Sequence, residues 1–224
     1  MSIRETVSIL ALCVSLSITA AATEKTPPKT TVDGLNLIEG TKMALVYAKP
    51  DVDLSQYNRI LLIEPQVAFT RNWLRTQNSI PGQTVRKQDM ERIKKDLAEL
   101  FMEVFRQELQ NNGGYVLVDG VAEDVLIVRP AIIDLDVFAP DTPGTARSRS
   151  AIPSAGTMTL YMELIDSVTG DTLVKAMDNK FDRTRTRIQA QNRIRNEGAA
   201  REMLSNWANV LRLALDEART VVSK

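Results

Sequence analysis

The stretch TMTLYMELID-SVTGD-TLVKAMDNKF, residues 157–181, decides the fold that we expect for this chain. Its first ten residues alternate large apolar side chains with other residues, which is the period of a strand with one buried face. The apolar positions are Met158, Leu160, Met162 and Leu164. Gly170 lies in the connection and can take the positive φ that tight turns require. The stretch therefore predicts a hairpin of two strands, residues 157–166 and 172–181.

Two long amphipathic helices are predicted outside this hairpin. Residues 85–110 carry one apolar stripe at helical spacing, and Gly113-Gly114 follows as a stop signal. The stripe consists of Met90, Ile93, Leu97, Leu100, Phe101, Val104, Phe105 and Leu109. Residues 199–222 carry a second stripe. It consists of Met203, Leu204, Trp207, Val210, Leu211, Ala214, Leu215 and Ala218.

The remaining elements suggest how the domain is arranged. Further strands are predicted at residues 43–47, 57–64, 115–118 and 125–138, with a loop at 76–83. Four successive strands in the second half favour a mixed or antiparallel sheet with the helices on one side. We therefore expect a single α+β domain over residues 43–224, with two long amphipathic helices on one face of the sheet. Residues 23–42 are expected to form a flexible tether.

Residues 1–22 are predicted to be a secretory signal peptide. Arg4 supplies a short positive region, residues 7–18 form an apolar run, and Ala20-Ala21-Ala22 supplies small residues for cleavage. The apolar run is shorter than the roughly 20 residues that a membrane-spanning helix needs. These features predict a periplasmic or secreted protein that is cleaved after Ala22.

Cys13 is the single cysteine, and it leaves two alternatives for the mature protein. A lipidated cysteine follows a small residue, whereas Leu12 precedes Cys13 and the chain stays apolar after it. The favoured interpretation is a cysteine within the leader, which leaves the mature chain without a thiol. The alternative is an outer-membrane lipoprotein anchored through Cys13.

The composition excludes several chemistries. The 224 residues include no histidine, and Cys13 lies in the leader. Ser-His-Asp catalysis, Cys-His catalysis and the common zinc sites are therefore excluded. Lys plus Arg equals Asp plus Glu at 28 each, and this balance gives no support for nucleic-acid binding. We expect no cofactor, no metal site and no nucleic-acid partner.

Three segments together resemble one bacterial family. In chain order they are YAKP with DLSQY within residues 47–57, DSVTGDTL at 166–173 and WANVLR at 207–212. This series is similar to uncharacterised bacterial lipoproteins of the domain-of-unknown-function family 3313, over residues 34–216. The resemblance implies an envelope protein, and it carries over no established activity or catalytic residue. Leu12 departs from the lipid-attachment pattern of such lipoproteins.

Asp134 and Asp136 are the candidates for acid–base chemistry. Their i, i+2 spacing on a predicted strand would place them on one face, about 6.5 to 7 Å apart. That distance lies at the lower edge of the range of about 6.5 to 9.5 Å used by inverting glycosidases. Acids on an exposed sheet face are more often solvated or paired with cations, so we favour a non-catalytic interpretation.

Five arginines gather within thirteen residues ahead of the second helix, and Arg147 and Arg149 lie in an earlier loop. The five are Arg183, Arg185, Arg187, Arg193 and Arg195. Guanidinium groups bind carboxylates and phosphates bidentately, so this segment is the candidate binding surface for an anionic partner. The alternative is that the arginines are solvated or act as counter-charges for Asp134 and Asp136.

These observations favour an exported envelope protein that is a non-catalytic accessory or binding module and not an enzyme. Its expected partner is an envelope protein or an anionic envelope surface, with peripheral or lipid-anchored association to a membrane. The alternative function is a glycosidase-like hydrolase that uses Asp134 and Asp136.

Overall fold

The hairpin predicted from the period of two lies at the middle of the sheet. β7 (Thr157–Asp166) and β8 (Thr172–Phe181) have the predicted bounds and pair antiparallel. Between them, Gly170 has a φ of 74°, which a glycine adopts without steric cost. The predicted hairpin is therefore confirmed.

The computed structural model describes residues 26–137, 156–181 and 193–221. The predicted leader, residues 138–155, and the segment with Arg183, Arg185 and Arg187 lie outside these residues. Within them, the other strands are β1 (Asn36–Leu37), β2 (Leu45–Ala48), β3 (Arg59–Leu62), β4 (Gln66–Phe69), β5 (Val116–Leu117) and β6 (Val125–Asp136).

The strands form one mixed sheet in the order β1-β2-β8-β7-β6-β3-β5, with β4 also paired to β6. β3 runs parallel to both β5 and β6, and β4 runs parallel to β6. The remaining pairs, from β1 across to β6, are antiparallel. Of the two predicted alternatives, the mixed sheet is therefore the observed one.

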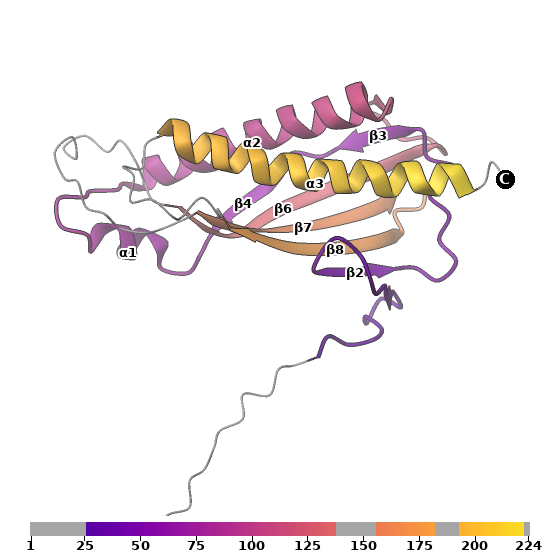
Figure 1. Cartoon of the computed structure of the whole chain (residues 1–224), viewed down its shortest axis with the longest axis horizontal. Helices are drawn as coiled ribbons and strands as arrows, with labels where there is room; N and C mark the ends of the chain where they lie inside the picture. Colours follow the sequence, from indigo (N-terminus) through magenta and orange to yellow (C-terminus); the bar gives the residue numbers. More distant parts are fainter. Residues whose placement is uncertain (1–25, 138–155, 182–192, 222–224) are drawn as a thin grey trace, which may run out of the picture.

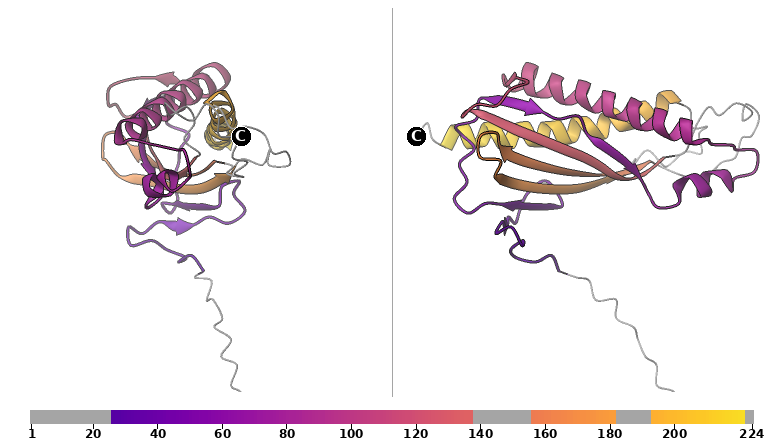
Figure 2. Two further views of the ribbon diagram at one scale, coloured as in Figure 1. Left: turned by 90° about the vertical axis from the view of Figure 1, so that its left-hand side faces the viewer. Right: turned by 180° about the vertical axis from the view of Figure 1, so that it is seen from behind.

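Two long helices cover one face of this sheet (Figures 1 and 2). They are α2 (Lys87–Arg106), which continues into the π-helix η1 (Gln107–Asn112), and α3 (Arg193–Val221). Ion pairs join Glu103 to Arg201 and Glu108 to Arg212, so the two helices lie side by side and run in the same direction. The α+β architecture with two helices on one face is confirmed.

The core lies between the helices and the alternating apolar positions of the sheet. The helix-facing side chains of β7 are Met158, Leu160, Met162 and Leu164, all at most 5% exposed. They face the stripes of α2 and α3, which include Phe101, Phe105, Leu204 and Trp207. At the end of η1, a Cβ on Gly113 would lie 2.8 Å from the Leu109 carbonyl oxygen, so glycine permits this tight exit.

Three short elements were missed by the sequence analysis. β1 lies within the stretch predicted as a tether, where Leu35 is buried and Asn36–Leu37 pairs with β2. The fold therefore extends upstream of residue 43. β4 and the short helix α1 (Trp73–Asn78) were not predicted either, and α1 overlaps the predicted loop at 76–83. The second long helix also begins earlier than predicted, at Arg193.

Candidate functional site

An apolar cavity of about 340 Å³ lies between the middle of α2, the N-terminal part of α3 and one end of the sheet. Its volume lies at the lower end of the range of about 300 to 1,000 Å³ that is typical of ligand pockets. The apolar walls come from α2, α3, β6 and β7. They include Ile93, Leu97, Leu100, Leu135, Val137, Met158, Ala199, Ala200 and Met203.

The cavity exists because the apolar stripe of α3 begins with small side chains. Ala199, Met203 and Trp207 follow one another at steps of four residues, so they lie on one face of the helix. Trp207 is 1% exposed and fills the space between α3 and the sheet. One and two turns earlier, Met203 and Ala199 reach less far, and the space above the end of β6 and the start of β7 stays open.

Four carboxylates border this cavity, and they come from both helices. Asp96, Glu99 and Glu103 belong to α2, and Glu197 belongs to α3. The lining residues in the described ranges include no lysine or arginine. Four acidic side chains therefore lie among the residues that line an otherwise largely apolar cavity.

Two cations near the cavity pair with three of these carboxylates. Arg201 donates to Glu103 at 2.9 Å and lies 3.8 Å from Glu197, and Lys95 lies 3.6 Å from Glu99. The hydrogen bond from Arg201 lowers the pKa of the Glu103 carboxyl, which keeps it ionised. These pairs are exposed, and such pairs hold side chains only loosely.

Asp134 and Asp136 lie at a β-bulge, and the distance predicted between their carboxyl groups stays a prediction. The register of β6 against β7 shifts between Ile133 and Asp136, and Asp134 has a φ of 52°, in the left-handed region. This bulge breaks the alternation on which the i, i+2 argument depended. Leu135 lines the cavity, whereas Asp134 and Asp136 are exposed and do not line it.

The arginine segment lies immediately before α3 and at its start in the sequence. Arg183, Arg185 and Arg187 lie outside the described residues. The backbone of Arg193 and Arg195 belongs to the first turn of α3, close in sequence to Glu197. The prediction that these arginines bind a partner stays a prediction.

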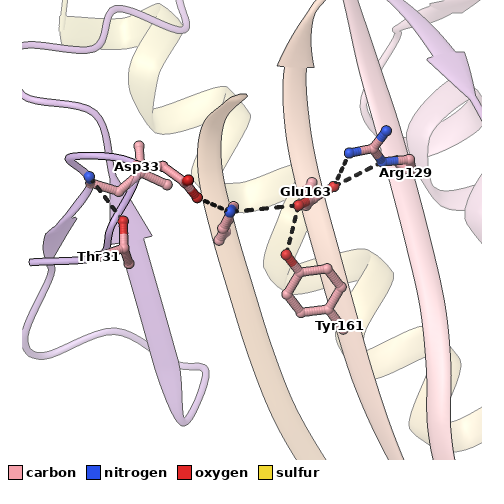
Figure 3. Close-up of polar contacts among 7 residues, drawn as sticks. Thr31, Asp33, Arg129, Tyr161 and Glu163 are labelled. Atoms are coloured by element: carbon pink, nitrogen blue, oxygen red, sulfur yellow. Dashed lines mark hydrogen bonds and ion pairs between the residues drawn. The ribbon is translucent and has the colours of Figure 1, made fainter. Parts of the chain in front are cut away.

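The opposite face of the sheet carries a row of charged side chains (Figure 3). Glu163 of β7 accepts hydrogen bonds from Arg129 Nε at 2.8 Å and from the Tyr161 hydroxyl at 2.6 Å. Lys175 of β8 lies 3.9 Å from Glu163 and also pairs with Asp33 of the N-terminal segment. The row therefore ties the turn before β1 to three strands of the sheet.

The groups of this row are poorly suited to proton transfer. Burial alone would raise the pKa of the Glu163 carboxyl, but hydrogen bonds from Tyr161 and Arg129 and the nearby cations lower it overall. Burial and the bond to Glu163 raise the pKa of Tyr161, so its phenol stays protonated. Glu163 is ionised and is held by its hydrogen bonds and ion pairs, so we interpret this row as a structural feature of the sheet. The cavity is therefore the better candidate site.

Two properties of the described residues bear on the chemistry of the site. They contain no cluster of three or more His, Cys, Asp or Glu side chains placed to hold a metal ion. Among the helices of the same ranges, none is long and apolar enough to cross a membrane.

The cavity was not predicted from the sequence, although two signals pointed to it. Gly198-Ala199-Ala200 places small residues at positions where the stripe of a packed helix normally has large ones. Asp96, Glu99 and Glu103 follow at steps of three and four, so they share one face of α2. Neither signal shows by itself that the two helices lie side by side.

The fold and this cavity define a two-layer α+β domain, and the sequence places it in a family. The model of the family described as "Protein of unknown function (DUF3313)" matches residues 36–211, so the chain belongs to that family. The resemblance found in the three segments is thereby confirmed. A comparison with curated proteins finds no match.

Several solved structures are similar in fold at low sequence identity. The PelC dodecamer from Paraburkholderia phytofirmans is 11% identical, with a TM-score of 0.40 over 75% of this chain and 96% of that one. Protein XCC0632 from Xanthomonas campestris is 13% identical, with a TM-score of 0.38 over 79% and 94%. A candidate lipoprotein from Caulobacter crescentus is 11% identical, with a TM-score of 0.34 over 76% and 93%.

Proposed function

We propose that this chain is a non-catalytic binding module of the bacterial envelope, which takes an apolar group into the cavity between α2 and α3. The observation that carries the proposal is the cavity itself, whose walls are apolar and whose polar groups lie at the border. Concave, mostly apolar sites with a few polar groups are the usual form of ligand-binding sites in proteins.

The positions of Asp134 and Asp136 favour a binding function over the alternative of a hydrolase. A glycosidase needs two carboxyl groups that face the same bond of a bound substrate. Asp134 and Asp136 lie at a β-bulge and do not line the cavity. The chain has no histidine to act as a general base in their place.

Filling the cavity should abolish the binding of an apolar probe. We expect the fluorescence of N-phenylnaphthylamine, a neutral apolar dye, to rise when it is titrated with the protein. In Ala199→Phe, the phenyl ring should occupy the space beside Met203, and the affinity for the dye should fall at least about tenfold because the walls are already packed. Dye fluorescence and a urea titration of the same variant are the measurements.

The matched control is Ala214→Phe on the same helix. Ala214 is exposed and does not line the cavity, so this variant should bind the dye like the wild type. If the Ala199→Phe variant is folded and binds the dye as tightly as the wild type does, the cavity is not the binding site and the proposal is wrong.

Export rests on the leader sequence at residues 1–22, and it is tested separately. We expect the protein expressed from its full sequence in a Gram-negative host to appear in the periplasmic fraction. Its intact mass should correspond to a chain that begins at Thr23, because Ala20-Ala21-Ala22 offers small residues to the signal peptidase. A chain that begins at Cys13 and carries the mass of a diacylglyceryl group would instead establish the lipoprotein alternative. A cytoplasmic chain that still contains residues 1–22 would refute export.

A further inference from the structure

We infer that the face of the sheet opposite to α2 and α3 binds a second copy of this chain. The two copies pack face to face about a two-fold axis that runs along the strands between β7 and β8. This surface, called the open face below, is formed by β2, β8, β7 and β6. It is separate from the cavity, and its role does not depend on the proposed function.

The outward positions of β6 are more apolar than a strand that faces only water requires. On the open face β6 presents Ile127, Arg129, Ala131 and Ile133, and its three apolar side chains are only half-buried. A sheet with one solvated face normally alternates apolar residues with polar ones along each strand. Apolar groups that stay accessible on such a face mark a contact surface.

A row of alternating charge crosses the open face (Figure 3). In order from the N-terminal segment to β6, it consists of Asp33, Lys175, Glu163 and Arg129. Each group pairs with its neighbour, and the row has no net charge, so a ligand of a single sign gains nothing from it. A surface that carries the same alternation in reverse order meets an opposite charge at every position.

A second copy of the chain presents this reversed order. The two-fold axis places Arg129 opposite Asp33 of the second copy, and Glu163 opposite Lys175 of the second copy. Both contacts occur twice, because a two-fold interface uses the same surface on each copy. Arg129 and Asp33 are about half exposed and make the direct contact. A guanidinium has five donors, more than the two that Arg129 uses on Glu163.

The neighbouring row of residues is apolar, and it also matches itself about this axis. The strand registers align Leu45, Met177, Tyr161 and Ala131 across β2, β8, β7 and β6. The axis sets Tyr161 against Met177 of the second copy and Ala131 against Leu45 of the second copy. Met177 is exposed and the other three are half-buried, so the contact removes apolar surface from water.

An exposed turn adds to this contact. The Gly34 N–H donates to the Thr31 carbonyl at 3.0 Å, so Val32 and Asp33 are the central residues of a β-turn. Val32 is fully exposed to solvent. Because Asp33 ties the turn to the open face, the two-fold axis carries the turn onto β6 of the second copy. There Val32 packs beside Ile127 of the second copy.

The open face is large enough for a dimer. β7 and β8 have ten residues each, a length of about 33 Å, and four strands span about 19 Å. The projected area is therefore about 600 Å² on each copy, to which the turn adds. Standard interfaces bury about 800 Å² on each partner. Sheets commonly pack face to face with their strands nearly aligned.

The test is sedimentation equilibrium of the protein expressed from its full sequence, in which we expect a concentration-dependent dimer. Val32→Glu should weaken the dimer at least about tenfold, because a charge would be placed in an apolar contact of each copy. Val32 is fully exposed within its own chain, so its replacement should leave the urea midpoint unchanged. Val121→Glu is the matched control, since Val121 is an exposed valine in the loop between β5 and β6. It should dimerise like the wild type.

A charge exchange tests the orientation of the two copies. Asp33→Arg and Arg129→Asp, each alone, oppose like charges at both ends of the row, so each should weaken the dimer about threefold to tenfold. In an equal mixture, the two variant chains oppose unlike charges at both ends. The mixture should therefore dimerise within about threefold of the wild type. A role of these residues confined to their own chain would not be rescued by mixing.

Three outcomes would overturn the inference. A wild-type chain that stays monomeric over a wide range of concentration leaves the open face to some other partner. A dimer that Val32→Glu leaves unchanged is formed by another surface. Variants that mixing does not rescue show that the copies do not meet in this orientation. The dye titration tests the cavity on the other face of the sheet, so each result is read independently of the proposed function.

Discussion

Replacing Phe101 by alanine is expected to lower the free energy of unfolding by about 3 to 5 kcal/mol. Phe101 lies in the middle of the α2 stripe and is 0% exposed. Its ring stacks on Phe105 at a centroid distance of 3.9 Å. The variant loses the transfer free energy of the ring and leaves a cavity that the helix and the sheet cannot close.

Urea unfolding followed by circular dichroism measures this loss. Leu213→Ala on α3 is the control, because Leu213 is 36% exposed and its replacement should change the stability by about 0.5 kcal/mol or less. A loss below 1 kcal/mol for Phe101→Ala would contradict the packing of α2 on the sheet.

Replacing Asp178 by alanine is expected to cost about 3 kcal/mol, although Asp178 is a charged residue on a strand. Asp178 is 6% exposed on the helix-facing side of β8. Its carboxylate accepts hydrogen bonds from the Trp207 indole N–H at 2.8 Å and the Ala44 backbone N–H at 3.0 Å, and it pairs with Lys180. Alanine would leave two donors without their acceptor inside the fold, and it would detach α3 and the start of β2 from the same point.

A double-mutant cycle with Trp207→Phe tests this account of Asp178. Both residues contribute to one hydrogen bond, so the two losses of stability should add to more than the loss in the double variant. Asp171→Ala is the control, because Asp171 pairs with Lys49 at the surface and should contribute at most about 1 kcal/mol. Strict additivity, or a loss below 1 kcal/mol for Asp178→Ala, would show that the contact has little effect on stability.

The elements with a strong local pattern were predicted with accurate bounds. β7 and β8 match residue by residue, because alternation along each strand reports directly which face is buried. The short helix α1 has no such pattern. It has six residues, its N-cap Asn72 has a φ of 64° and makes no side-chain capping bond, and it is held through Trp73, whose indole donates to the Val137 carbonyl.

The candidate site was only partly open to prediction. Asp134 and Asp136 are exposed acids on β6, as predicted, but the bulge at Asp134 depends on the register against β7, which no local pattern encodes. The carboxylates of α2 could be assigned to one helix face from their spacing. Their proximity to Glu197 depends on α3 lying beside α2, and parallel to it, on the same face of the sheet.

The sequence by itself determined the strands of the hairpin, the two long helices, the family and the chemistries that a chain without histidine lacks. Each of these depends on residue identity or on periodicity within a few turns, where neighbours in sequence are neighbours in space. The tertiary structure alone decided the parallel pairing of β3 and β4 with β6, the bulge at Asp134 and the cavity under Ala199. These features arise where segments far apart in the chain compete to fill one space, and the side chains of both partners set the outcome.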